Sequence, residues 1–181
     1  SIMGDGTSHA LHTKVEPTGK CISVSEVSLG RSLHQLSFDV APGEVVGIAG
    51  VEGNGQRELV DLLSGLVECE SGRVLINDEA LGREPRAKRV ATVFEDRQTE
   101  GLVLDASIAN NVLLGDFARF SSYGWLRERE MRHEADARLQ AVGAPIRLDE
   151  PVRTLSGGNQ QKVVVARALA QIERGAKVLL L

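Results

Sequence analysis

The sequence predicts an α/β fold, and three segments indicate it. Val45–Ala49 is a short apolar run rich in β-branched residues, typical of a strand buried on both faces, and it leads into a glycine-rich turn. Ser156–Gly158 precedes an apolar helical pattern. Between about Lys20 and Val46, apolar and polar residues alternate, which predicts strands with one solvated face. We therefore expect one domain that combines sheet and helices.

The N-terminal part is predicted to form a small sheet. Residues 1–19 are rich in Gly, Ser, Thr and His, and we interpret them as a linker from a preceding domain or an expression remnant, with the domain itself covering residues 20–181. Apolar alternation predicts strands over 22–27 and 36–40, and Pro42-Gly43 marks a turn. Residues 72–79 are interpreted as a further strand with its turn.

The glycine-rich turn has the spacing of a phosphate-binding loop. Gly50 and Gly55 are separated as in the pattern Gly, four residues, Gly, Lys, Ser or Thr, and an apolar helical stripe follows from Leu59 until Ser64-Gly65. Gln56 stands in place of the lysine and Arg57 in place of the Mg²⁺-binding hydroxyl. The backbone N–H groups would still accept a phosphate, although hydrolysis at this loop should be poor. A glycine-rich connection without a ligand is the alternative.

The middle of the chain is predicted to be mainly helical. A strand over 90–94 ends at Glu95, a short helix contains Ile108, Val112 and Leu113, and a longer one spans 128–142. Four of the six aromatic residues lie close together, and they predict either a docking surface or the core of a helical subdomain: Phe117, Phe120, Tyr123 and Trp125.

The segment Leu155–Lys162 carries the most specific functional signal in the chain. A serine and two glycines turn the chain into a helix whose first N–H groups and positive dipole end are predicted to face outward, ready for a phosphate. An ordinary loop before an N-capped helix is the alternative interpretation. The last apolar run, Lys177–Leu181, predicts a final strand.

Composition excludes several classes of function. The chain has a net charge of -4 and no block of Lys or Arg, so nucleic acid is not an expected partner. No apolar run approaches the roughly 20 residues of a membrane span. Cys21 and Cys69 have no metal-ligand spacing, and the four histidines form no ligand pattern, so neither a disulfide nor zinc is expected.

The two phosphate-type motifs resemble, in order and separation, the phosphate loop and signature of ATP-binding-cassette (ABC) ATPases, over nearly all of the chain after Cys21. Gly47–Gln56, Glu95–Gln98 and Gly101–Asp105 resemble more narrowly the second, degenerate cassette of double-cassette importers for simple sugars and nucleosides. The resemblance implies a P-loop NTPase (RecA-like) core, a small antiparallel β subdomain and an α-helical signature subdomain. Such a core would be truncated here in its Walker B strand, Lys177–Leu181.

The resemblance also implies the ligands ATP and Mg²⁺. Glu95 occupies the position of a glutamine that touches Mg²⁺ in most cassettes; a surface carboxylate is the alternative. The adenine-stacking aromatic residue of the family is missing before Leu36, where His34 is the nearest ring. The residues assigned to the nucleotide are Gly50, Gly53, Asn54, Gly55, Gln56, Arg57, Glu58, Ser156, Gly157, Gly158 and Gln160.

Such cassettes work as head-to-tail pairs, in which the signature of one closes over the ATP on the phosphate loop of the other. By resemblance, Ser156–Gly158 would act on an ATP held by the first cassette of the same chain, and this fragment alone would be inactive. Transmembrane permease subunits and, indirectly, a substrate-binding protein are the other implied partners, at the cytoplasmic face of the bacterial inner membrane. A non-catalytic nucleotide-binding or regulatory module is the alternative.

Overall fold

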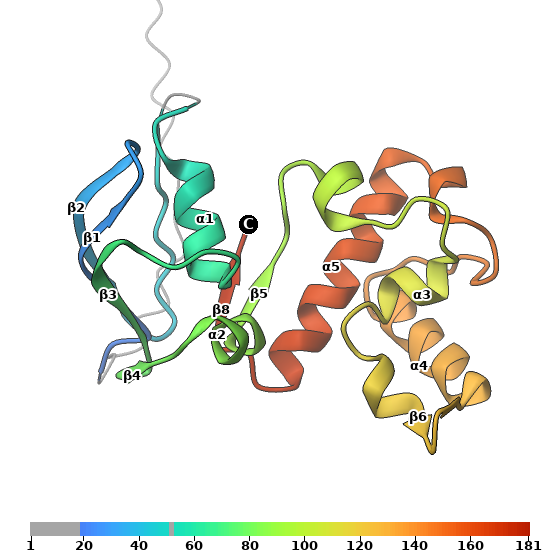
Figure 1. Cartoon of the computed structure of the whole chain (residues 1–181). Coiled ribbons are helices and arrows are strands. Elements are labelled where there is room, and N and C mark those ends of the chain that lie inside the picture. Colours follow the sequence, from blue (N-terminus) through green and yellow to red (C-terminus); the bar gives the residue numbers. More distant parts are fainter. Residues whose placement is uncertain (1–18, 51–52) are drawn as a thin grey trace, which may run out of the picture.

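The computed structural model describes residues 19–50 and 53–181 (Figure 1). The proposed linker therefore lies almost entirely outside the described residues. Figure 1 shows a β-rich part and a helical part, with strand β5 and helix α5 between them. The predicted mixed α/β fold with separate β and helical subdomains is confirmed.

The β subdomain is an antiparallel sheet in the order β2-β1-β3-β4. Its strands are β1 (Ile22–Leu29), β2 (Leu33–Val40), β3 (Ser71–Ile76) and β4 (Glu79–Ala80). The first three were predicted, with shorter bounds for β1 and β2, whereas β4 was not predicted as a separate strand. The turn at Pro42-Gly43 is also confirmed, because Glu44 N donates to Ala41 O at 3.1 Å.

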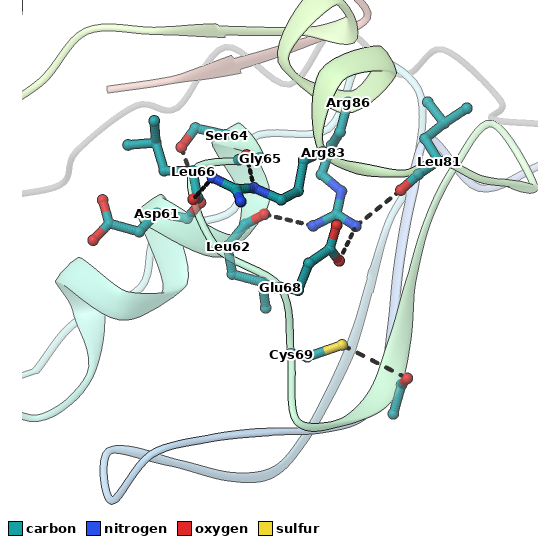
Figure 2. Close-up of polar contacts among 11 residues, drawn as sticks. Asp61, Leu62, Ser64, Gly65, Leu66, Glu68, Cys69, Leu81, Arg83 and Arg86 are labelled. Atoms are coloured by element: carbon teal, nitrogen blue, oxygen red, sulfur yellow. Dashed lines mark hydrogen bonds and ion pairs between the residues drawn. The ribbon is translucent and has the colours of Figure 1, made fainter.

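Helix α1 (Gln56–Ser64) packs on this sheet and ends where predicted, at Gly65. Gly65 has φ 82°, and a Cβ there would lie 2.6 Å from the carbonyl oxygen of Arg83, so the position requires glycine. Figure 2 shows two arginines of α2 (Arg83–Arg89) that donate to carbonyls at this end, Arg86 to Leu62 O at 2.9 Å and Arg83 to Leu66 O at 2.7 Å. These cations complement the negative pole of α1 and fix its C-terminus.

The central sheet consists of β5 (Val90–Thr92) and β8 (Val178–Leu180), which pair in parallel. The prediction of a buried strand at Val45–Ala49 is wrong. Residues 44–50 have no regular structure, and Val45 is 97% exposed. A strand needs a neighbour to bond its backbone groups, and within the described residues no ladder reaches this segment.

The helical part contains both short and long elements. In chain order they are the π-helical turn η1 (Arg97–Gly101), α3 (Ile108–Val112), the 3₁₀ turn η2 (Phe117–Phe120), the hairpin of β6 (Ser121–Ser122) and β7 (Trp125–Leu126), α4 (Glu128–Ala141), the 3₁₀ turn η3 (Val152–Thr154) and α5 (Gly157–Glu173). The predicted helices at α3, α4 and α5 are confirmed. The η1 turn and the hairpin were not predicted.

Two hydrophobic clusters hold the fold together. One lies between the β subdomain and α1 and includes Val27, Leu62 and Ile76, which are almost fully buried. The other lies among β5 and helices α3 to α5 and includes Leu139 and Val163, each with no exposed surface. Helix α5 is therefore fixed along its length by apolar packing, while its first turn stays at the surface.

Candidate functional site

The first turn of α5 has the predicted geometry. Ser156 is the N-cap, with φ -61° and ψ 155°, and its Oγ accepts a hydrogen bond from Asn159 N at 3.4 Å. Gly157 and Gly158 follow in helical conformation and are exposed. The N–H groups that begin a helix have no partner inside the helix, and the dipole adds partial positive charge there. This turn can therefore bind an anion from solvent.

Gln160 does not share that exposed surface. Its side chain is buried, with 3% of the residue exposed, and it lies between Gln98 and the carbonyl of Val152, each at 3.4 Å. Gln160 was assigned to the nucleotide by resemblance alone. In the structure it supports the turn from inside, at the point where η1 and η3 meet α5.

The η1 turn is hydrogen-bonded to α5. It was not predicted from the sequence. Asp96 caps it, because Oδ1 accepts from the N–H groups of Gln98 at 3.1 Å and Thr99 at 3.3 Å. Hydrogen bonds from the Thr99 side chain and backbone hold the pKa of Asp96 below its usual range. At the other end, Arg167 Nη2 donates to Gly101 O at 2.7 Å. The turn is therefore fixed at both ends.

The glycine-rich loop keeps part of a phosphate nest. Gly53 and Gly55 have φ of 86° and 94°, and Gly55 precedes the first residue of α1. A Cβ at Gly55 would lie 2.8 Å from a methyl of Leu33 and 2.9 Å from Ser32 O, so no other residue fits. Alternating backbone conformations of this kind point successive N–H groups toward one anion. Residues 51 and 52, in the middle of the loop, lie outside the described part.

The side chains that follow the glycine-rich loop contact other parts of the chain and do not face a phosphate site. Gln56 folds back over Gly50, since a Cβ on that glycine would lie 2.1 Å from Gln56 Nε2. The guanidinium of Arg57 forms an ion pair with Glu100 of η1. Glu58 accepts a hydrogen bond from Ser32 Oγ at 3.1 Å. Consequently, neither a lysine ammonium nor a hydroxyl faces the place where the phosphates and Mg²⁺ would lie.

A hollow of about 380 Å³ adjoins the loop, between α1 and the hairpin of β1 and β2. Apolar side chains, including Leu36, Ile48 and Leu59, form much of its wall, and Asn54 and His34 also line it. A ring nitrogen of His34 lies 2.9 Å from Arg31 O, which holds the imidazole beside the hollow. The only ring among the described residues that line the hollow is the imidazole of His34.

The described residues do not form a preorganised metal site. Glu95 is exposed at the end of the segment that follows β5, and no group of three or more potential His, Cys, Asp or Glu ligands occurs among the described residues. At Arg57 a cation stands where the hydroxyl ligand of a phosphate loop would be, which opposes Mg²⁺ at that position. Mg²⁺ therefore fits poorly with this loop.

The four clustered aromatic residues differ in burial, and so they divide between the two predicted roles, the core of the helical subdomain and a docking surface. Phe120 is buried and Phe117 packs against the helical core, whereas Tyr123 is fully exposed and Trp125 is 81% exposed on the β6–β7 hairpin. The docking interpretation thus applies to two residues only. Within the described residues, no helix has the length and apolar character to cross a membrane.

Proteins with similar sequences include the ATP-binding proteins of importers. The chain is 37% identical over 156 residues to the ribose import ATP-binding protein RbsA 1 of Rhizobium johnstonii, a match that covers 82% of this chain and 30% of that protein. It is 36% identical over 174 residues to the nucleoside import ATP-binding protein NupA of Lactococcus lactis subsp. cremoris, covering 89% and 33%. The chain thus spans about a third of the length of these relatives.

Solved structures show the same fold. The cbiO1 protein of Clostridium perfringens, part of the ABC transporter complex cbiONQ, superposes with a TM-score of 0.67 at 21% identity, over 90% of this chain and 78% of that one. The dimeric ATP-binding cassette MJ0796 bound to ADP and Pi gives 0.67 at 21% identity, over 88% and 86%. The predicted ABC cassette fold is confirmed. A family model described as "ABC transporter" matches residues 33–181, and the chain therefore belongs to the ABC transporter family.

Proposed function

We propose that this chain is a cassette of a bacterial ABC importer for simple sugars or nucleosides. Relatives named for ribose and nucleoside import support this class of cargo. The cassette would use ATP and couple its binding and hydrolysis to transport through permease subunits. It would lie at the cytoplasmic face of the inner membrane, and a substrate-binding protein would deliver the cargo.

Within that assembly, we assign the chain chiefly to the role of signature donor. The observation that supports this role is the exposed first turn of α5, with Ser156 as its cap and two glycines that leave the N–H groups open. These groups would bind the terminal phosphate of an ATP held on the phosphate loop of another cassette. The turn would contribute only after that cassette docks, so this chain alone would not hydrolyse ATP.

The glycine-rich loop of this chain would form the weaker, second site. Its backbone suits a phosphate, but Gln56 folds over the loop and Arg57 is paired with Glu100. A nucleotide at this loop would therefore bind without efficient hydrolysis. Glu95 would contact Mg²⁺ there only if phosphate oxygens of the nucleotide completed the coordination.

The test of this role is a Ser156→Arg variant of the full-length protein, assembled with its permease subunits. The bulky cation should block closure of the two cassettes and abolish ATP hydrolysis, while ATP binding to the first cassette is retained. Arg129→Gln, at an exposed position of α4, is the matched control. An unchanged hydrolysis rate in the Ser156 variant would favour the alternative, a non-catalytic nucleotide-binding or regulatory module.

A further inference from the structure

We propose that Arg97 is an additional phosphate-binding residue of the signature turn. This inference rests on the proposed function, in which the turn acts on the ATP of another cassette. A Cβ on Gly157 would lie 2.8 Å from Arg97 Nη2 and 3.8 Å from its Cζ. The guanidinium therefore lies directly against the first helical residue of α5, beside the N–H groups that begin the helix.

The charge of Arg97 is not neutralised by the chain. Within the described residues, no carboxylate forms an ion pair with it, and its buried Nε has no hydrogen-bond partner. Of the neighbouring acidic residues, Asp96 caps η1 and Glu100 pairs with Arg57, and the exposed Glu95 forms no ion pair with Arg97 among the described residues. A cation at the positive end of a helix is unfavourable by itself. A phosphate between them would relieve this repulsion and interact with both positive groups.

The turn that carries Arg97 is held against α5. Gln98 Nε2 lies 3.4 Å from Gln160 Oε1, and Arg167 Nη2 donates to Gly101 O at 2.7 Å, so η1 is held to α5 on both sides of the turn. Arg167 is itself buried, with 8% exposed, which makes its contact insensitive to solvent. Because the backbone of η1 is already held, only the Arg97 side chain must be ordered when a phosphate binds, which limits the entropic cost.

The guanidinium of Arg97 adds a full positive charge, which the signature turn itself lacks. The backbone N–H groups and the Ser156 hydroxyl are neutral donors, whereas Arg97 supplies a full positive charge and a planar pair of N–H groups that match phosphate oxygens. Gly157 is the second requirement, because any side chain there would displace the guanidinium. Arg97 and Gly157 should therefore act as one unit.

The test measures steady-state ATP hydrolysis by the full-length protein in its assembled importer, with Arg97→Gln, Arg97→Lys, Gly157→Ala and the double variant Arg97→Gln/Gly157→Ala. We expect Arg97→Gln to lower kcat/KM by roughly tenfold to a hundredfold, the range of one charge-assisted hydrogen bond. Arg97→Lys should recover part of this loss. The double variant should be no worse than the more impaired single variant. Arg129→Gln is the control, and thermal unfolding of each variant checks that the fold is retained.

The outcomes separate this inference from the function on which it rests. If Ser156→Arg abolishes hydrolysis while Arg97→Gln leaves kcat/KM unchanged, the role of Arg97 is refuted and the signature role stands. If both variants hydrolyse ATP at the parent rate, the signature role fails as well. Fully additive losses in the double variant would refute the contact between Arg97 and Gly157 as the cause.

Discussion

The substitution Asp116→Asn tests what holds α5 in place. Asp116 Oδ2 accepts from Arg138 Nη1 of α4 at 2.8 Å and from Arg174 Nη2, just after α5, at 2.9 Å. The side chains of Asp116 and Arg138 are only 9% and 6% exposed. The asparagine would remove the negative charge and leave two guanidinium groups facing each other in a region with little water.

Removal of one partner of a buried ion pair costs about 3–5 kcal/mol. Glu134, whose side chain is 36% exposed, accepts from Arg138 Nε at 2.9 Å and still offsets part of that charge. We therefore expect the free energy of unfolding to fall by about 3 kcal/mol, the lower end of the range. For a domain of this size, that corresponds to a decrease in Tm of roughly 6–12 °C.

Thermal unfolding followed by circular dichroism measures this change. The matched control is Asp149→Asn, since Asp149 pairs with Arg132 at the surface, where their side chains are 69% and 54% exposed, and its Tm should lie close to that of the parent. Adding Arg138→Met to Asp116→Asn should recover part of the loss, because the buried charge is removed. A Tm of Asp116→Asn within about 2 °C of the parent would refute the reasoning.

Three further outcomes are expected. Gly55→Ala should lower the free energy of unfolding by roughly 1–3 kcal/mol in urea, more than Gly53→Ala, because only at Gly55 would the new methyl meet neighbouring atoms, the nearest at 2.8 Å. Gln56→Lys combined with Arg57→Ser restores the phosphate-loop pattern and should tighten calorimetric ATP binding at least about tenfold in the presence of Mg²⁺; an unchanged Kd would show that other features limit the loop. Because the folded pKa of Asp96 is depressed, its caps to η1 are fully present above the unfolded value of about 3.9 and are lost as pH falls through the lower folded pKa. The protection of the η1 amides, measured as their exchange rate relative to the intrinsic rate at the same pH, should therefore fall only at acidic pH, and Asp96→Asn should abolish this dependence.

The helices were predictable because their signals are local. Ser156 caps α5, Gly65 ends α1, and the apolar spacing that predicts α4 places Met131, Ala135 and Leu139 in the core. By contrast, Val45–Ala49 has the composition of a strand but no partner in the described residues, and pairing is a non-local property. The η1 turn was missed because a π-helical turn has no apolar period of its own.

The candidate site was predictable by residue type but not by contact. The sequence indicated that Gln56 and Arg57 replace a lysine and a hydroxyl. It could not indicate that Arg57 reaches Glu100, 43 residues away, because the fold decides which surfaces meet. The same applies to Arg97 and Gly157. Only the hairpin offered an overlooked local signal, since Tyr123-Gly124, with φ of 50° and 85°, forms a tight turn between strands.

Strand β5 belongs to both hydrophobic clusters at once. Val90 packs with the β subdomain and α1, as does Val178 of β8, whereas Ala91 packs with the helical part. Successive residues of a strand point to opposite faces, so this one strand serves both sides. The helical part cannot unfold without exposing a face of the strand on which the β subdomain also depends. We therefore expect a single cooperative unfolding transition, with the backbone amides of β5 among the slowest in the chain to exchange with deuterium.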